Sequence, residues 1–189
     1  MTRILILYGT TDGHTRKIAE AIAETLRQEE CSVEVFEAAA VPPPPGPRQY
    51  DGVIVAASVH VGGYQRAVKR WVRAHAEGLN RSATAFVSVC LAVLERRPEV
   101  EQELGEIMQR FFRRCAWRPT IHKVVAGAVP YTRYGWLKKW VMKRIVRKAG
   151  GGTDTTRDYE YTDWNDLNRF IDEFLAATAL QNASHKPAG

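Results

Sequence analysis

The chain of 189 residues has only three cysteines, Cys31, Cys90 and Cys115, and they lie far apart. Their spacing fits neither a metal-binding motif nor an even set of disulfides, so we interpret them as reduced thiols of a cytoplasmic protein. No apolar run reaches the roughly 18 residues that a membrane-spanning helix needs. The N-terminus begins directly with an apolar segment, and we therefore expect no secretory signal peptide.

The two commonest glycine-rich phosphate motifs are also missing. The sequence has neither the glycine spacing of the dinucleotide fingerprint nor the lysine of a P-loop. A ligand with a pyrophosphate is therefore not expected, and we predict no metal site. With 45% hydrophobic residues, the chain is long enough for one core, which we place in a single domain at residues 1–180, with a disordered tail at 181–189.

A hydroxyl-rich turn follows the first apolar run. Ile4–Leu7 predicts a buried parallel strand, and the spacing of apolar residues from Ile18 to Leu26 predicts a helix. A turn between such elements gathers backbone N–H groups and hydroxyls at the positive end of the helix dipole, which suits a phosphate. An ordinary turn without a ligand is the alternative. The turn consists of Thr10, Thr11, Asp12, Gly13, His14 and Thr15.

The rest of the chain alternates between predicted strands and helices. We predict strands at 33–36, 53–58, 85–89 and 124–129, with one helix through Val68, Trp71 and Val72, another starting at Pro98 and a last one starting after an N-cap at Thr162. This alternation predicts an α/β fold with a parallel sheet that is covered on both faces. Five strands with a ligand loop after the first favour the doubly wound order 2-1-3-4-5.

In that order, three loops at the carboxyl ends of the strands form one crevice. The first loop would bind the phosphate, and the other two would flank a flat ring. Gly62 and Gly63 would let the backbone approach the ring, although they could equally form a plain turn, and Tyr64 would stack on it. The second loop contributes Ser58, Val59, His60, Gly62, Gly63 and Tyr64, and the third contributes Ser88, Val89, Cys90, Leu91 and Ala92.

The excess positive charge lies in one segment. Six of the 27 Lys and Arg residues fall between positions 138 and 148, and the remaining 21 equal the 21 Asp and Glu residues. We predict a basic helical insertion at 130–152, whose exposed face would contact an anionic membrane surface. Alternatively, its tryptophans pack on the domain and its charges are solvated; nucleic acid is less favoured, because no recognised nucleic-acid fold is present. The predicted membrane contacts are Trp136, Lys139, Trp140, Lys143, Arg144 and Arg147.

Several short motifs accompany the threonine turn. They are Asp12-Gly13, Ala57-Ser58 with Gly63-Tyr64, Trp117-Arg118-Pro119, Ala126-Gly127-Ala128, Tyr131 with Arg133, Tyr134 and Trp136, Gly150-Gly151 before Thr153-Asp154-Thr155, and Tyr161-Thr162-Asp163-Trp164. The turn resembles the FMN-phosphate loop of flavodoxins, except that Asp12 stands where flavodoxins carry a hydroxyl residue. The chain to about residue 180 resembles the flavodoxin-type, quinone-dependent protoporphyrinogen oxidases of bacterial haem synthesis.

This resemblance implies a flavodoxin-like fold, FMN at the three loops, and oxidation of protoporphyrinogen IX to protoporphyrin IX with a membrane quinone as acceptor. It also implies a peripheral position on the inner face of the cytoplasmic membrane. No catalytic acid or base is assigned, because FMN itself carries the redox step. The substrate propionates need cations, for which the candidates are Arg66, Arg96, Arg97 and Arg133, although each could be a solvated surface arginine.

Two other functions stay open at this point. One is a flavodoxin-like electron carrier, which the basic insertion disfavours because such carriers are usually acidic around the flavin. The other is a quinone reductase that is supplied with electrons by a nicotinamide. The sequence leaves the oligomeric state open, and a homodimer is compatible with it.

Overall fold

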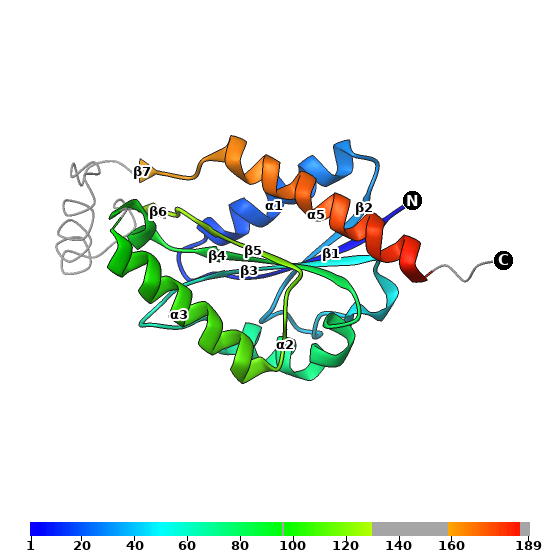
Figure 1. Ribbon diagram of the computed structural model, residues 1–189, viewed down its shortest axis with the longest axis horizontal. Coiled ribbons are helices and arrows are strands. Elements are labelled where there is room, and N and C mark those ends of the chain that lie inside the picture. The colour runs from blue at the N-terminus through cyan, green and yellow to red at the C-terminus, as the bar shows by residue number, and fades with distance from the viewer. Residues whose placement is uncertain (96, 130–158, 186–189) are drawn as a thin grey trace.

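The computed structural model describes residues 1–95, 97–129 and 159–185. Its centre is a five-stranded parallel sheet of order β2-β1-β3-β4-β5, which confirms the predicted doubly wound topology (Figure 1). The strands are β1 (Arg3–Gly9), β2 (Ser32–Glu37), β3 (Gly52–Ser58), β4 (Ala83–Val89) and β5 (Ile121–Val125).

Helices cover both faces of this sheet. Helices α1 (His14–Gln28) and α5 (Trp164–His185) pack on one face, and α2 (Arg66–Leu79) and α3 (Pro98–Cys115) on the other (Figure 1). Successive side chains of a strand point to opposite faces, so Leu5 and Leu7 pack with α2 and α3 while Ile4 and Ile6 pack with α1 and α5. Short 3-10 helices, η1 (Pro47–Gln49) and η2 (Leu91–Glu95), precede β3 and follow β4.

An aromatic cluster anchors α3 to the sheet. Phe86 of β4 lies 5.2 Å from Phe111 and 5.8 Å from Trp117, measured between ring centroids. Trp117 is 1% exposed, and its indole N–H donates to Thr84 Oγ1 at 3.2 Å. The cluster buries large apolar side chains and satisfies the indole donor, which fixes the end of α3.

The prediction of a fifth strand at 124–129 was wrong in its bounds. Strand β5 ends at Val125, and after Ala126 and Gly127 the chain forms β6 (Ala128–Val129), which pairs antiparallel with β7 (Tyr159–Glu160). The chain leaves the sheet because the carbonyl of Ala126 accepts from Thr162 Oγ1 and that of Gly127 accepts from the Tyr161 N–H. The first residues of β5, Ile121–Lys123, are partly polar, and for this reason the sequence pattern did not predict them as strand.

The last helix differs from its prediction at both ends. Thr162 bonds to Ala126 instead of capping α5; the cap is Asp163, whose Oδ1 accepts from the Asp166 N–H at 2.9 Å. The helix continues to His185, so residues 181–185 are helical where we predicted a disordered tail. The basic helical insertion at 130–152, with its six predicted membrane contacts, lies outside the described residues.

Candidate functional site

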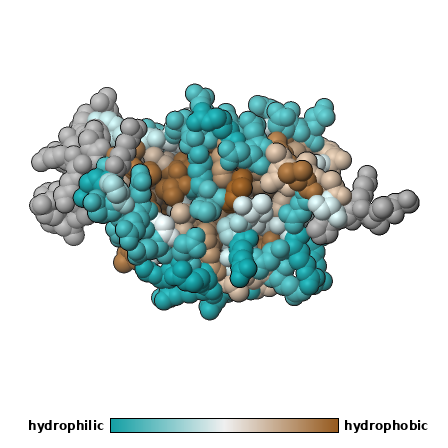
Figure 2. Space-filling model, in the orientation of Figure 1, coloured by the Kyte–Doolittle hydropathy of each residue, from teal (hydrophilic) through white to brown (hydrophobic). Residues whose placement is uncertain are grey.

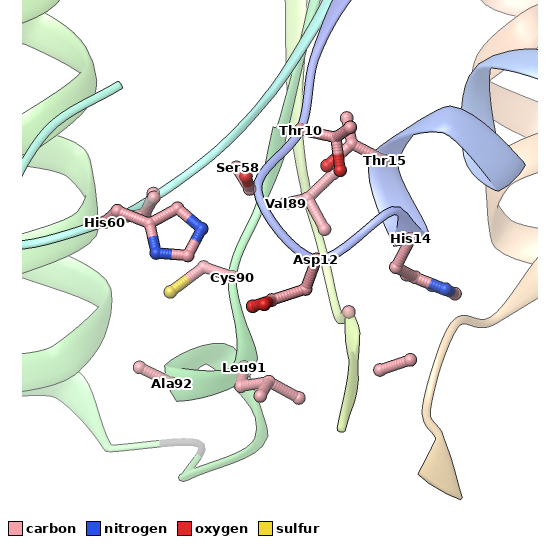
Figure 3. Close-up of a pocket in the computed structure, with 13 residues that line it drawn as sticks. Thr10, Asp12, His14, Thr15, Ser58, His60, Val89, Cys90, Leu91 and Ala92 are labelled. Carbon is pink, nitrogen blue, oxygen red and sulfur yellow. The ribbon is translucent and has the colours of Figure 1, made fainter. Parts of the chain in front are cut away.

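The predicted loops meet in one crevice of about 260 Å³ at the carboxyl edge of the sheet (Figure 3). A further wall comes from Gly127, in the turn after β5, and from Ala128, the first residue of β6. The predicted site residues that line the crevice are Thr10, Asp12, His14, Thr15, Ser58, Val59, His60, Val89, Cys90, Leu91 and Ala92. Those predicted residues that do not line it are Thr11, Gly13, Gly62, Gly63, Tyr64 and Ser88.

The turn from β1 to α1 has the properties of an anion cradle. Gly13 precedes the helix with a φ of 90°, and its N–H donates to Thr10 Oγ1 at 2.9 Å. In this described helix, no side chain caps the N-terminus and the first turn holds no acidic residue. The first N–H groups of α1 and the hydroxyls of Thr10 and Thr15 are thus available to a phosphate at the positive end of the dipole.

Asp12 does not disturb this cradle. Its carboxylate points away from the hydroxyls of Thr10 and Thr15 and toward the part of the crevice near Cys90 and Leu91 (Figure 3). A carboxylate turned this way avoids the repulsion that it would exert on a bound phosphate. The donor set therefore fits a phosphate monoester such as that of FMN.

Gln65 holds two of the loops together, and the sequence analysis missed it. Its Nε2 donates to Ser58 Oγ at 2.7 Å and to Thr11 Oγ1 at 3.3 Å. Its Oε1 is buried and has no hydrogen-bond partner among the described residues. Thr11 therefore contacts Gln65 from outside the crevice, through the longer of these two hydrogen bonds. In the sequence, Gln65 is only a single glutamine just before a helix, and such residues are too common to be predicted as functional.

Tyr64 lies in the core, so the prediction that it stacks on a bound ring was wrong. It is 5% exposed, and its ring contacts Phe86 and Phe111 at centroid distances of 5.0 and 4.9 Å. Its hydroxyl and that of Ser88, which is fully buried, share a hydrogen bond of 2.8 Å. Burial raises the pKa of the Tyr64 phenol, so it stays protonated.

His14 forms the start of a hydrogen-bond chain at the crevice edge. Its Nε2 lies 2.8 Å from Thr162 Oγ1, and that hydroxyl donates to the carbonyl of Ala126. Because the hydroxyl has only one proton to donate, Nε2 must donate to Thr162, which leaves Nδ1 as the acceptor in the neutral ring. Burial lowers the pKa of His14, while nearby Glu160 opposes this shift.

The pH dependence of stability should reflect this histidine. The folded-state pKa of His14 lies below the ordinary value of 6.5, so the unfolded chain takes up the proton more readily. The contribution of His14 is therefore complete above about pH 6.5 and declines as the pH falls from there toward the folded-state pKa. We expect His14→Gln to flatten the slope of unfolding free energy against pH between about pH 7.5 and 5.5, measured by urea titration.

His122→Gln, an exposed substitution on β5, serves as the control for replacing a histidine elsewhere in the chain. His75, whose pKa burial also lowers, contributes equally to all three chains. If His14→Gln keeps the parent's slope of unfolding free energy against pH, the lowered folded-state pKa of His14 is contradicted.

The predicted substrate arginines are not gathered at the crevice. Arg66 is exposed on the first turn of α2, and Arg97 forms an ion pair with Glu95. Arg96 and Arg133 lie outside the described residues. The crevice thus has no described arginine in its lining.

A doubly wound sheet with an anion cradle after its first strand, and two further loops at the switch point, defines a flavodoxin-type protein. A family model described as a flavodoxin domain matches residues 5–156. Among solved structures, an oxidised flavodoxin from Bacillus cereus is similar, with a TM-score of 0.55, 16% identity, and coverage of 93% of this chain and 98% of that one. A flavodoxin from Streptococcus pneumoniae is similar with a TM-score of 0.54, 16% identity, and coverage of 92% and 98%.

Curated relatives identify a subgroup within the flavodoxin-domain family. A protein of Escherichia coli K12 named protoporphyrinogen IX dehydrogenase (quinone) is 34% identical over 177 residues, which cover 93% of this chain and 96% of that protein. A protein of Leishmania major with the same name is 31% identical over 179 residues, covering 92% of this chain and 75% of that protein. The chain therefore belongs to the flavodoxin-domain family, in the group of relatives that carry this name.

Proposed function

We propose that this chain is an FMN-dependent oxidoreductase that oxidises protoporphyrinogen IX to protoporphyrin IX and passes the electrons to a quinone. The observation that carries the proposal is the 34% identity to the Escherichia coli dehydrogenase over nearly the full length of both chains. The crevice supports it, because a cradle for one phosphate without a pyrophosphate motif suits FMN better than a dinucleotide. We further propose that one FMN-binding domain extends from residue 1 to the end of α5.

Each part of the crevice would have its own task. Thr10, Thr15 and the first turn of α1 would hold the phosphate, and Gln65 would keep the cradle next to Ser58. The loops that end β3 and β4 would flank the ring system and exclude water from one of its edges. FMN supplies the redox chemistry of such a site. The six electrons and six protons that leave each porphyrinogen end on three quinones, each of which becomes a quinol.

Anaerobic turnover tests this function. The purified protein loaded with FMN should lose its flavin absorbance when protoporphyrinogen is added and recover it when a quinone follows, with protoporphyrin formed in proportion to the quinone consumed. If the flavin stays oxidised with protoporphyrinogen but is reduced rapidly by a nicotinamide, the chain is a quinone reductase and this proposal is wrong. A flavin that reacts with neither but exchanges electrons with redox proteins would favour the electron carrier.

The route to a quinone in the bilayer is the second part of the proposal. None of the helices in the described ranges is long and apolar enough to cross a membrane. We propose that the chain binds the membrane periphery through the basic segment with Trp136 and Trp140, as its sequence pattern suggests. Turnover with a long-chain quinone in anionic vesicles should then fall as salt rises, whereas turnover with a short, water-soluble quinone should not. Equal salt responses would exclude this route.

A further inference from the structure

The loop between β3 and α2 separates two cavities. Val59 and His60 line the crevice, whereas Gly62 and Gly63 line a second cavity of about 170 Å³. The loop closes as a tight turn, because His60 and Gly63 exchange backbone hydrogen bonds of 2.8 and 3.1 Å. His60 and Gly62 are two residues apart, so their Cα atoms lie within about 7.6 Å of each other. One extended ligand could therefore reach both cavities.

Four cations line the second cavity, two from each of the neighbouring helices. Lys69 and Arg73 come from α2, and Arg110 and Arg114 come from α3. Figure 2 shows the outer surface over these helices as mainly hydrophilic. The two cations of α2 are far in sequence from the two cations of α3. The packing of α2 against α3 brings all four together.

The guanidinium of Arg73 is already held in place. Its Nε donates to the carbonyl of Arg114 at 3.0 Å, near the C-terminus of α3, and this leaves its other N–H groups for a ligand. Between the cations, the aromatic side chains of Tyr64 and Phe111 contribute an apolar lining. The cavity thus combines fixed positive charge with an apolar surface, which suits an anion attached to an apolar body.

These cations have no acidic partners in the part of the chain that the structure describes. No carboxylate there lies within 4.0 Å of their charged nitrogens. Glu106, one turn before Arg110, instead accepts a hydrogen bond from Gln102 at 3.0 Å. Stabilisation of the α3 dipole explains cations near the end of α3, but it does not explain the pair on α2, which lies before the last turn of its helix.

We propose that this cavity is the subsite that binds the propionate carboxylates of the porphyrinogen, while its ring lies at the crevice. The inference rests on the proposed function for the identity of the substrate. Arginine is suited to carboxylates because its planar N–H groups can bind both oxygens. The subsite takes the role for which the sequence analysis named Arg66, Arg96, Arg97 and Arg133. Of these, Arg66 and Arg97 lie in the described ranges, and neither lines this cavity.

A pair of matched variants tests the subsite. Arg73→Gln with Arg110→Gln removes one cation from each helix inside the cavity. Arg70→Gln with Arg113→Gln removes one cation from each of the same helices, at exposed positions outside the cavity. Both variants lower the net charge equally, so bulk electrostatics affects them alike. Thermal unfolding and FMN content establish that each chain is folded and loaded.

Binding of protoporphyrin IX and of its dimethyl ester is measured by fluorescence titration of the FMN-loaded protein. We expect the cavity variant to bind the diacid about tenfold more weakly than the parent, because charge-assisted hydrogen bonds are lost. The affinity for the ester, which has no carboxylates, should be unchanged. The control variant should bind both porphyrins as the parent does.

The outcomes separate this inference from the proposed function. If the parent oxidises protoporphyrinogen but the cavity variant binds the diacid as tightly as the parent, the subsite is wrong and the function stands. If the diacid binding depends on the cavity although the parent does not oxidise protoporphyrinogen, the subsite stands and the function fails. If both variants lose the same affinity for the diacid, bulk charge explains the binding and the subsite is wrong. If the cavity variant loses only affinity for phosphatidylglycerol vesicles, the cations bind a lipid surface and the subsite is also wrong.

Discussion

Replacing Thr10 and Thr15 together with alanine should remove most of the affinity for FMN. Each hydroxyl that donates to a charged phosphate contributes about 1.5–3 kcal/mol, so the double variant should lose about 3–6 kcal/mol, or at least a hundredfold in Kd. Thr10 also accepts the Gly13 N–H, so the variant loosens the turn as well as removing a donor. Titration of free FMN with the apoprotein, followed by quenching of flavin fluorescence, measures the change.

Thr11→Ala is the matched control, because Thr11 is exposed and lies outside the crevice lining. Its hydroxyl contacts Gln65 at a long 3.3 Å, so its loss should change FMN affinity by less than about 1 kcal/mol. If the double variant binds FMN as tightly as Thr11→Ala, the phosphate is not held by this turn.

Gly9→Ala should destabilise the fold, although it adds only one methyl group. Gly9 ends β1, and a Cβ there would lie 2.4 Å from Val68 Cγ2 and 3.0 Å from Gln65 Oε1. Val68 is fully buried, so α2 must shift to make room, at a cost of about 1–3 kcal/mol in unfolding free energy. Urea denaturation of the apoprotein measures this loss.

The same shift should weaken FMN binding, because Gln65 moves with α2 and joins Ser58 to Thr11. Gly105→Ala is the control, since a Cβ at Gly105 within α3 meets nothing within 4 Å. That substitution should leave FMN affinity unchanged and stabilise the helix by about 0.5–1 kcal/mol. A Gly9→Ala chain as stable as the parent would mean that α2 does not pack as closely as the structure has it.

The strand order and the cradle could be predicted because both depend on local patterns. Apolar runs such as Ile4–Leu7 mark strands that are buried on both faces, and right-handed connections then leave few topologies. The threonine turn sits at the one place where a doubly wound sheet has a ligand crevice. Eleven of the predicted site residues line the crevice for this reason.

The errors arose where tertiary contacts override local patterns. Tyr64 follows a glycine pair in a loop, and nothing local distinguishes a ring that stacks on a ligand from one that packs on Phe86. The end of β5 is set by hydrogen bonds from Tyr161 and Thr162, which come more than thirty positions later in the chain. Counting charges along the sequence identified the run at 138–148 but not the four cations of the second cavity, because only helix packing brings those together.

The antiparallel pair of β6 and β7 has a consequence for how this family could diversify. Val129 and Tyr159 are direct partners in that pair, so the two ends of the segment 130–158 are fixed a strand spacing apart, beside the crevice. Lys17 of α1 holds the second end through its ion pair with Glu160 at 2.6 Å. Because the entropy of closing a loop grows only slowly with its length, evolution could lengthen, shorten or exchange this segment with little effect on the sheet. The length of this segment could thus change independently of the cofactor cradle.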